Sequence, residues 1–163
     1  MAHKTNSMRM LDQRGIAYKA HQFPEDVHSA EGVAEVLQVP PGQVYKTLVV
    51  MRQRGKPLLV LVPGDQALDL KQLARASGEK KLRMATYKEA EDLTGLQVGG
   101  ISALPLLHKG FDVFVDQSIL SWPEVYISPG RRGLNISLDP RDLLWVTDAQ
   151  PAHLTSTDDE GVT

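Results

Sequence analysis

The segment Tyr45–Val62, YKTLVVMRQRGKPLLVLV, contains the strongest strand signals of this chain. Two apolar runs, Tyr45–Met51 and Leu58–Val62, are rich in valine and leucine, as is typical of buried strands. The segment Arg52–Pro57 between them is polar, contains a glycine and a proline, and is short enough to form a turn. We therefore predict a β-hairpin, around which the other elements pack.

Outward from this hairpin, helices and strands follow one another irregularly. Capping residues and stop signals predict helices over residues 8–14, 29–38, 69–77, 86–94 and 139–146. Apolar runs predict strands over residues 16–23, 111–116, 124–128 and 134–138, the last two paired as a second hairpin. A regular βαβ winding would alternate strictly, so we predict an α+β fold with a mixed, strongly curved sheet.

The composition is that of a globular domain, with 163 residues of which 42% are hydrophobic and 23% charged. We expect one domain over residues 1–149 and a loosely ordered acidic tail over residues 150–163. The net charge of −2 argues against a general nucleic-acid coat, so a polyanion would need a local patch. With no secretory signal and no apolar run of about 18 residues, we expect a cytoplasmic protein without a membrane partner.

Sequence motifs of several common enzyme classes do not occur in the chain. It contains no nucleophile elbow, zinc-protease helix, P-loop or dinucleotide-binding fingerprint. It has no cysteine, which excludes a thiol nucleophile, a disulfide or a thiolate metal site within it. Its five histidines are never closer than seven positions apart, a spacing that does not favour zinc. We expect neither a metal nor a cofactor.

Three segments could carry chemistry. Lys46 stands in an otherwise apolar strand, so it is either a rim lysine beside the hairpin or a contact for an anion. The pair Gly99-Gly100 forms either a tight loop or an approach for backbone N–H groups to a carboxyl, phosphate or oxyanion. The loop Ser128–Gly133, with two arginines, is either a hairpin tip or a contact for a phosphodiester.

With these segments, the chain resembles the YbaK/ProX family of free-standing aminoacyl-tRNA deacylases, which are similar to the editing domain of bacterial prolyl-tRNA synthetases. The resemblance implies a curved, barrel-like mixed sheet surrounded by short helices. It also implies hydrolysis of the ester that joins a wrong amino acid to the 3′-CCA end of a tRNA, with prolyl-tRNA synthetase as a partner. The matching stretches follow the family order and are Gln43–Leu48, Leu68–Lys71, Val98–Ser102, Val125–Ser128 and Arg132–Leu134.

The resemblance further implies which residues form the site. Lys46 would bind the phosphate or ribose of the terminal adenosine. Gly100 would face the ester through its backbone, and Ser128 would line the opposite wall, so these three are the implied catalytic residues. The other residues implied to contact substrate are Phe23, Tyr45, Thr47, Gly99, Ile101, Ser102, Gly130, Arg131, Arg132 and Asn135.

Three positions differ from the cysteine-specific branch of that family. Phe23 replaces a tyrosine, Asn135 replaces an aspartate, and Ala103 stands where a proline is usual. Cysteine on proline tRNA is the first substrate we expect, with alanine, serine or threonine as alternatives, and a non-catalytic module that binds aminoacyl-tRNA or a nucleotide is the remaining hypothesis. Because the chain has no cysteine, the attacking group would be the substrate's own thiol or a positioned water.

Overall fold

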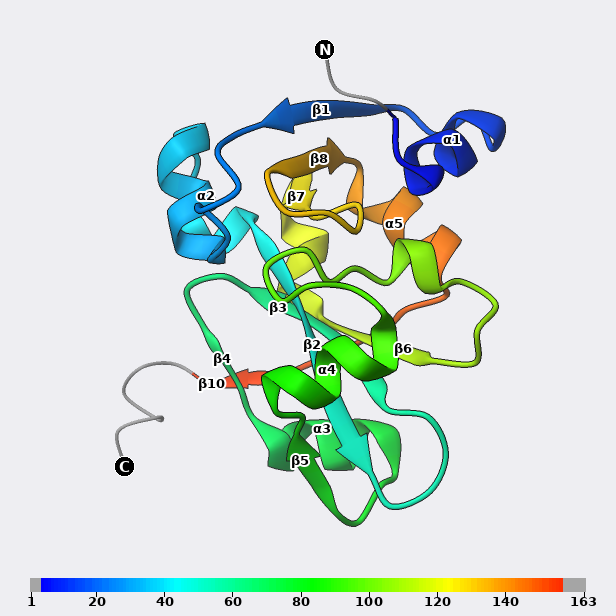
Figure 1. Cartoon of the computed structure of the whole chain (residues 1–163). Helices are drawn as coiled ribbons and strands as arrows, with labels where there is room; N and C mark the ends of the chain where they lie inside the picture. Colours follow the sequence, from blue (N-terminus) through cyan, green and yellow to red (C-terminus); the bar gives the residue numbers. More distant parts are fainter. Residues whose placement is uncertain (1–3, 157–163) are drawn as a thin grey trace.

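The computed structural model describes residues 4–156, which form an α+β fold of short elements (Figure 1), so the predicted fold class is confirmed. Within residues 4–156, no helix has the length and apolar character to cross a membrane. The helices are α1 (Asn6–Gln13), α2 (Ala30–Leu37), α3 (Leu70–Ser77), α4 (Tyr87–Thr94) and α5 (Pro140–Thr147), with 3-10 turns η1 (Pro41–Gln43), η2 (Leu104–Leu106) and η3 (Gln117–Ser121). The strands are β1 (Tyr18–Gln22), β2 (Tyr45–Arg52), β3 (Leu58–Pro63), β4 (Ala67–Leu68), β5 (Leu82–Met84), β6 (Asp112–Asp116), β7 (Val125–Ile127), β8 (Leu134–Leu138), β9 (Gln150–Ala152) and β10 (Thr155–Ser156).

The predicted hairpin lies inside a five-stranded sheet with the order β5-β2-β3-β6-β9. Strands β2 and β3 are antiparallel, with Tyr45 opposite Pro63 and Val50 opposite Leu58. Strand β5 is antiparallel to β2, whereas β6 is parallel to β3 and β9 is parallel to β6. All residues of β3 are buried, as expected for a strand covered on both faces. The predictions of the hairpin and of a mixed sheet are confirmed.

A three-stranded sheet, β1-β8-β7, lies above the larger sheet in Figure 1. Its pairs are antiparallel, so the second predicted hairpin, β7–β8, is also confirmed. An isolated parallel bridge between Val44 and Tyr126 links it to the start of β2. Closure into a barrel requires a continuous ladder of strands, whereas β5 and β9 are the two ends of the larger sheet. The expectation of a barrel-like sheet is therefore not confirmed.

The alternating side chains of β3 divide the interior into two cores. Leu59 and Leu61 belong to the larger cluster, which also contains residues of β7, β8 and α5 and so joins the two sheets. Leu58 and Val60 belong to a second cluster on the other face, together with Leu73 of α3. Burial on both faces explains why β3 has a continuous apolar sequence.

The carboxyl-terminal segment is more ordered than its sequence indicates. Residues 150–156 contain β9 and β10, and β10 pairs with β4. Leu154 is fully buried, and its N–H donates to a carboxylate oxygen of Asp116 at 2.9 Å. The prediction of a loose tail is wrong for these residues, because distant strands rather than a local pattern hold them. The rest of the predicted tail, residues 157–163, lies outside the described residues.

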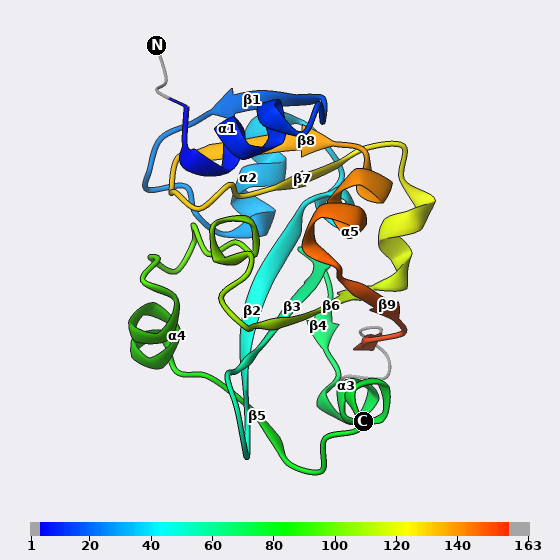
Figure 2. The same cartoon turned by 90° about the vertical axis from the view of Figure 1, so that its right-hand side faces the viewer.

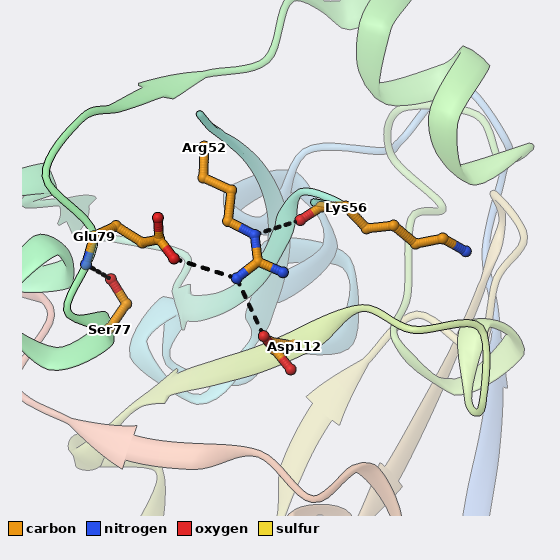
Figure 3. Close-up of polar contacts among 5 residues, drawn as sticks. All are labelled: Arg52, Lys56, Ser77, Glu79 and Asp112. Carbon is orange, nitrogen blue, oxygen red and sulfur yellow. Dashed lines mark hydrogen bonds and ion pairs between the residues drawn. The ribbon is translucent and has the colours of Figure 1, made fainter. Parts of the chain in front are cut away.

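Hydrogen bonds of the Arg52 side chain stabilise the end of the β2–β3 hairpin (Figure 3). Arg52, the last residue of β2, donates through Nη1 to Glu79 at 3.3 Å and to Asp112 at 3.2 Å. Its Nε donates to the carbonyl oxygen of Lys56 in the turn at 2.7 Å. Since the Arg52 side chain is only 15% exposed, these bonds tie β2 firmly to the turn, to the segment after α3 and to β6.

Candidate functional site

A cavity of about 390 Å³ opens beside β2. Its walls come from β2, the amino-terminal part of α2, the β5–α4 segment and the glycine loop before η2. In Figure 2, α2 lies above α4, and β2 runs past both. The predicted site residues that line the cavity are Tyr45, Lys46, Thr47, Gly99, Ile101, Ser128 and Asn135.

Lys46 brings a positive charge to this cavity. It is the second residue of β2, lies opposite Val62 of β3, and is half-buried. Glu31 also lines the cavity, but among the described residues no carboxylate lies within ion-pair distance of the Lys46 ammonium group. A half-buried lysine without a counter-ion is suited to an anionic ligand.

The glycine loop uses its two glycines in different ways. Gly99 has φ +96, and a Cβ there would lie 2.5 Å from Cβ of His28. Gly100 donates its N–H to the carbonyl of Gln97 at 2.8 Å, so that N–H is not directed at a ligand as the sequence-based hypothesis requires. Within residues 4–156, no backbone hydrogen bond takes up the N–H groups of Gly99 and Ile101. Since both residues line the cavity, their N–H groups are candidate donors to a ligand.

Ser128 connects the glycine loop to the β7–β8 loop. Its Oγ donates to the carbonyl of Gly100 at 3.0 Å and accepts the N–H of Gly130 at 3.0 Å. Arg132 makes a second connection, from Nε to the carbonyl of Val98 at 2.6 Å. The hydroxyl proton of Ser128 is therefore used within the protein, and the geometry supports a positioning role on the cavity wall.

Asn135 brings a buried side-chain amide to the wall of the cavity. It lies in β8, is 5% exposed, and lines the cavity. Its Nδ2 donates to the carbonyl of Leu134 at 3.2 Å, whereas its Oδ1 is buried and has no hydrogen-bond partner in the part of the chain that the structure describes. Buried polar atoms are nearly always paired in folded proteins, so this oxygen is an exception at the cavity wall and an acceptor that a hydrogen-bond donor could satisfy.

Two other predicted contact residues have their polar groups occupied in the core. The hydroxyl of Tyr45 lies 2.7 Å from Oγ of Ser118, and burial raises the pKa of Tyr45 to about 12. Ser102 is 2% exposed, and its Oγ accepts the N–H of Leu104 at the start of η2. Ser102 does not line the cavity, and its position supports a capping role instead of substrate contact.

A second, open groove of about 510 Å³ lies beside the β7–β8 loop. Phe23, Arg131 and Arg132 line it, together with Glu25. Gly130 has φ +118 and packs against Pro105. The structure therefore separates the predicted site into the cavity at Lys46 and this groove, which the β7–β8 loop borders.

Potential metal ligands do not gather in the cavity. His28 and Glu31 line it. In the part of the chain that the structure describes, no group of three or more histidine, aspartate or glutamate side chains is arranged to hold a metal ion.

The sequence does not reveal the cavity wall formed by β5 and the start of α4. Met84 and Tyr87 line the cavity there, and Tyr87 is 76% exposed. The sequence gives a capping signal at Thr86 and predicts α4, but it does not indicate that the start of this helix borders the cavity at Lys46.

Known protein families and curated proteins resemble this chain over most of its length. The family model of the aminoacyl-tRNA editing domain matches residues 24–145, which include every predicted site residue except Phe23. A protein of Enterococcus faecalis, provisionally named Cys-tRNA(Pro)/Cys-tRNA(Cys) deacylase EbsC, is 39% identical over 155 residues, with 94% of each chain covered. The proline–tRNA ligase of Aquifex aeolicus is 28% identical over 120 residues, which cover 65% of this chain and 20% of the ligase.

Solved structures share the fold. The crystal structure of hypothetical protein APE2540 has a TM-score of 0.83 at 27% identity and covers 91% of this chain and 97% of its own. A crystal structure described provisionally as a trans-editing enzyme for prolyl-tRNA synthetase has a TM-score of 0.78 at 29% identity, with 95% and 100% covered. The likeness therefore extends over nearly the whole described chain.

Proposed function

Because the chain belongs to the family of aminoacyl-tRNA editing domains, we propose that it is a deacylase that hydrolyses the ester between a wrong amino acid and the 3′ end of a tRNA. The observation that carries this proposal is Lys46, a half-buried cation without a counter-ion among residues 4–156, in a cavity lined in part by three of the segments of the family resemblance. In the reaction, water adds to the ester carbonyl, the bond to the ribose oxygen breaks, and a free amino acid and an uncharged tRNA result.

We assign Lys46 to the nucleotide end of the substrate. Its ammonium would bind the phosphate or ribose of the terminal adenosine and so fix the ester in the cavity. A charge-assisted contact of this kind is stronger than a neutral hydrogen bond and gains further from partial burial. Fixing the ester beside its donors is itself a large part of catalysis, since orientation replaces a bimolecular encounter.

We assign the acyl end to the opposite wall. The carbonyl oxygen of the ester gains negative charge as the tetrahedral intermediate forms. The N–H groups of Gly99 and Ile101, which have no backbone acceptor within residues 4–156, are suited to stabilise that charge. Oδ1 of Asn135 is an acceptor suited to the ammonium group that every aminoacyl ester carries. Ester hydrolysis in this arrangement needs no side-chain nucleophile.

Cysteine on proline tRNA is the substrate that we propose first. The name of the Enterococcus faecalis relative and the likeness to proline–tRNA ligases support it. Since this chain has no cysteine, an attacking thiol would be the substrate's own, and otherwise a water attacks. Prolyl-tRNA synthetase is the proposed partner in the cytoplasm, because a net charge of −2 gives the chain little general attraction for tRNA.

The test is a panel of proline tRNAs charged with cysteine, alanine, serine or threonine, with correctly charged prolyl-tRNA as the control. We expect the fastest ester loss with cysteine and some cross-activity, since one methylene discriminates only about 10- to 200-fold. Faster loss of another amino acid would reassign the specificity. Hydrolysis of none, with retained tRNA binding, would replace the deacylase by a non-catalytic binding module.

A further inference from the structure

We propose that Tyr87, with Met84 beside it, is the platform on which the base of the tRNA's terminal nucleotide stacks. This inference rests on the proposed function, because it takes the 3′ end of a tRNA as the ligand. It adds a base-binding subsite to a cavity whose other assignments concern only the phosphate, the ribose and the acyl group.

The first observation is the exposure of an aromatic ring at the edge of the cavity. Tyr87 is 76% exposed and Met84 is 40% exposed, and both line the cavity at Lys46. Trp145 is also 69% exposed, but it does not line the cavity. Tyr87 thus combines a wide accessible surface with a position beside the proposed site.

The second observation is that the backbone below the ring is firmly held. Met84 pairs with Val50 of β2, and the N–H of Ala85 donates to the carbonyl of Val49 at 3.0 Å. The strand pairing and the hydrogen bond connect this wall of the cavity to β2, the strand that contains Lys46. The platform and the lysine therefore belong to one rigid unit, which favours binding because little order has to be gained.

A capping box also fixes the first turn of α4, where Tyr87 is the first residue. The N–H of Glu89 donates to Oγ1 of Thr86 at 3.1 Å, and the N–H of Thr86 donates to Oε1 of Glu89 at 2.9 Å. Arg83 then donates twice to the Glu89 carboxylate, each time at 2.8 Å. These contacts hold the backbone of Tyr87 although its ring is open to solvent.

The chemistry of the substrate determines the occupant. When the aminoacyl ester lies in the cavity and Lys46 holds the phosphate or ribose, the base has to extend toward the rim. Aromatic side chains bind unpaired bases by stacking, because every base has a π face. The thioether of Met84 adds a polarizable surface of the kind that packs well on flat rings.

The experiment uses an acceptor-stem RNA whose terminal adenine is replaced by fluorescent 2-aminopurine, with the full chain as wild type, Tyr87→Ala, Tyr87→Phe and Trp145→Ala. We expect quenching of 2-aminopurine on binding to wild type, Tyr87→Phe and Trp145→Ala. Tyr87→Ala is expected to lose the quenching and to bind about tenfold more weakly, as for the loss of one stacked base. Quenching that persists in Tyr87→Ala, or is missing in wild type, would overturn the proposal.

A second RNA with an abasic terminal nucleotide makes the assignment specific. The affinity difference between wild type and Tyr87→Ala should vanish with this RNA, and an unchanged difference would show that the variant acts through general damage. Because these assays need no hydrolysis, they separate the two claims. A wild type that stacks the base but cleaves no ester would refute the deacylase and keep the subsite.

Discussion

Single polar groups without partners mark the cavity more clearly than any motif. Lys46 has a charge without a counter-ion among the described residues, and Asn135 has a buried oxygen without a donor. Each arrangement costs folding free energy, because a buried or half-buried polar group has lost water without full replacement. A substrate that brings a phosphate and an ammonium group would restore both partners.

We predict that Asn135→Leu raises the stability of the folded protein and lowers its deacylase activity. An unsatisfied buried polar group costs about 1–3 kcal/mol, whereas an apolar side chain of similar size does not. Loss of the contact to the substrate ammonium should lower kcat/KM about 10- to 100-fold. Urea unfolding and ester-loss kinetics measure the two effects.

Ser7→Ala is the matched control, because Oγ of Ser7 in α1 is the other buried oxygen without a partner among the described residues. This variant should also be more stable, and its activity should be unchanged. Equal activities of Asn135→Leu and Ser7→Ala would remove Asn135 from the substrate site.

For single residues, the sequence indicates a candidate site position only where the residue interrupts a local pattern. Lys46 could be identified because a lysine interrupts an apolar strand. The place of Tyr87 beside the cavity could not be predicted, since it depends on the pairing of β5 with β2. Gly100, a predicted site residue, does not line the cavity, and its N–H is occupied by the carbonyl of Gln97, a turn contact that the sequence does not reveal.

At the scale of elements, the site depends on contact between the glycine loop and the β7–β8 loop. A Cβ on Gly100 would lie 2.8 Å from the backbone N of Arg132 and 2.9 Å from the carbonyl carbon of Arg131. Gly100 does not have a positive φ, so its small size rather than its backbone conformation is what the contact requires. The Ser128 bond to its carbonyl closes the same contact.

Gly100→Ala should therefore push the two loops apart. We predict a loss of about 1–3 kcal/mol in the free energy of unfolding, which is typical of overpacking, together with slower deacylation. Gly42→Ala is the control, because a Cβ there would meet its nearest neighbour, Trp122, at an ordinary 3.5 Å. If both variants unfold at the same urea concentration and hydrolyse ester equally fast, the loop contact is not needed.

Elements with local signals could be predicted and elements without them could not. Each of the five helices has a capping side chain, at Thr5, Ser29, Asp69, Thr86 and Asp139, and the sequence pattern indicates the caps at Asp69, Thr86 and Asp139. The strands β4, β5, β9 and β10 have only two or three residues each. They exist because they pair with distant strands, so no local periodicity marks them.

On the scale of the whole molecule, two sheets share one core and the cavity lies where they meet. Residues of β2 and β3 and residues of β7 and β8 belong to the same apolar cluster. The α+β class and both hairpins could be predicted, because they follow from hydrophobic patterning and turns. The separation into two sheets depends on pairing between distant strands, and that information is not local.

The Arg52 contacts should stabilise this architecture without affecting the site. We predict that Arg52→Met lowers the free energy of unfolding by about 1–3 kcal/mol, since it removes the hydrogen bonds that a largely buried guanidinium group makes to Glu79 and Asp112. Its deacylase rate should equal that of wild type, because Arg52 does not line the cavity. Lys88→Met, which breaks an exposed pair with Asp92, should cost no more than about 0.5 kcal/mol. Equal urea midpoints for the two variants would contradict this account.

The most direct test of the central claim is the single-turnover rate at which Cys-tRNA(Pro) loses its ester with wild type, Lys46→Ala and Lys19→Ala. Lys19 is an exposed lysine in β1, away from the cavity, and so controls for the loss of one positive charge from a strand. We expect Lys46→Ala to be slower by about 10- to 100-fold, as for the loss of one charge-assisted contact, and Lys19→Ala to match wild type. Hydrolysis by Lys46→Ala at the wild-type rate would contradict the account.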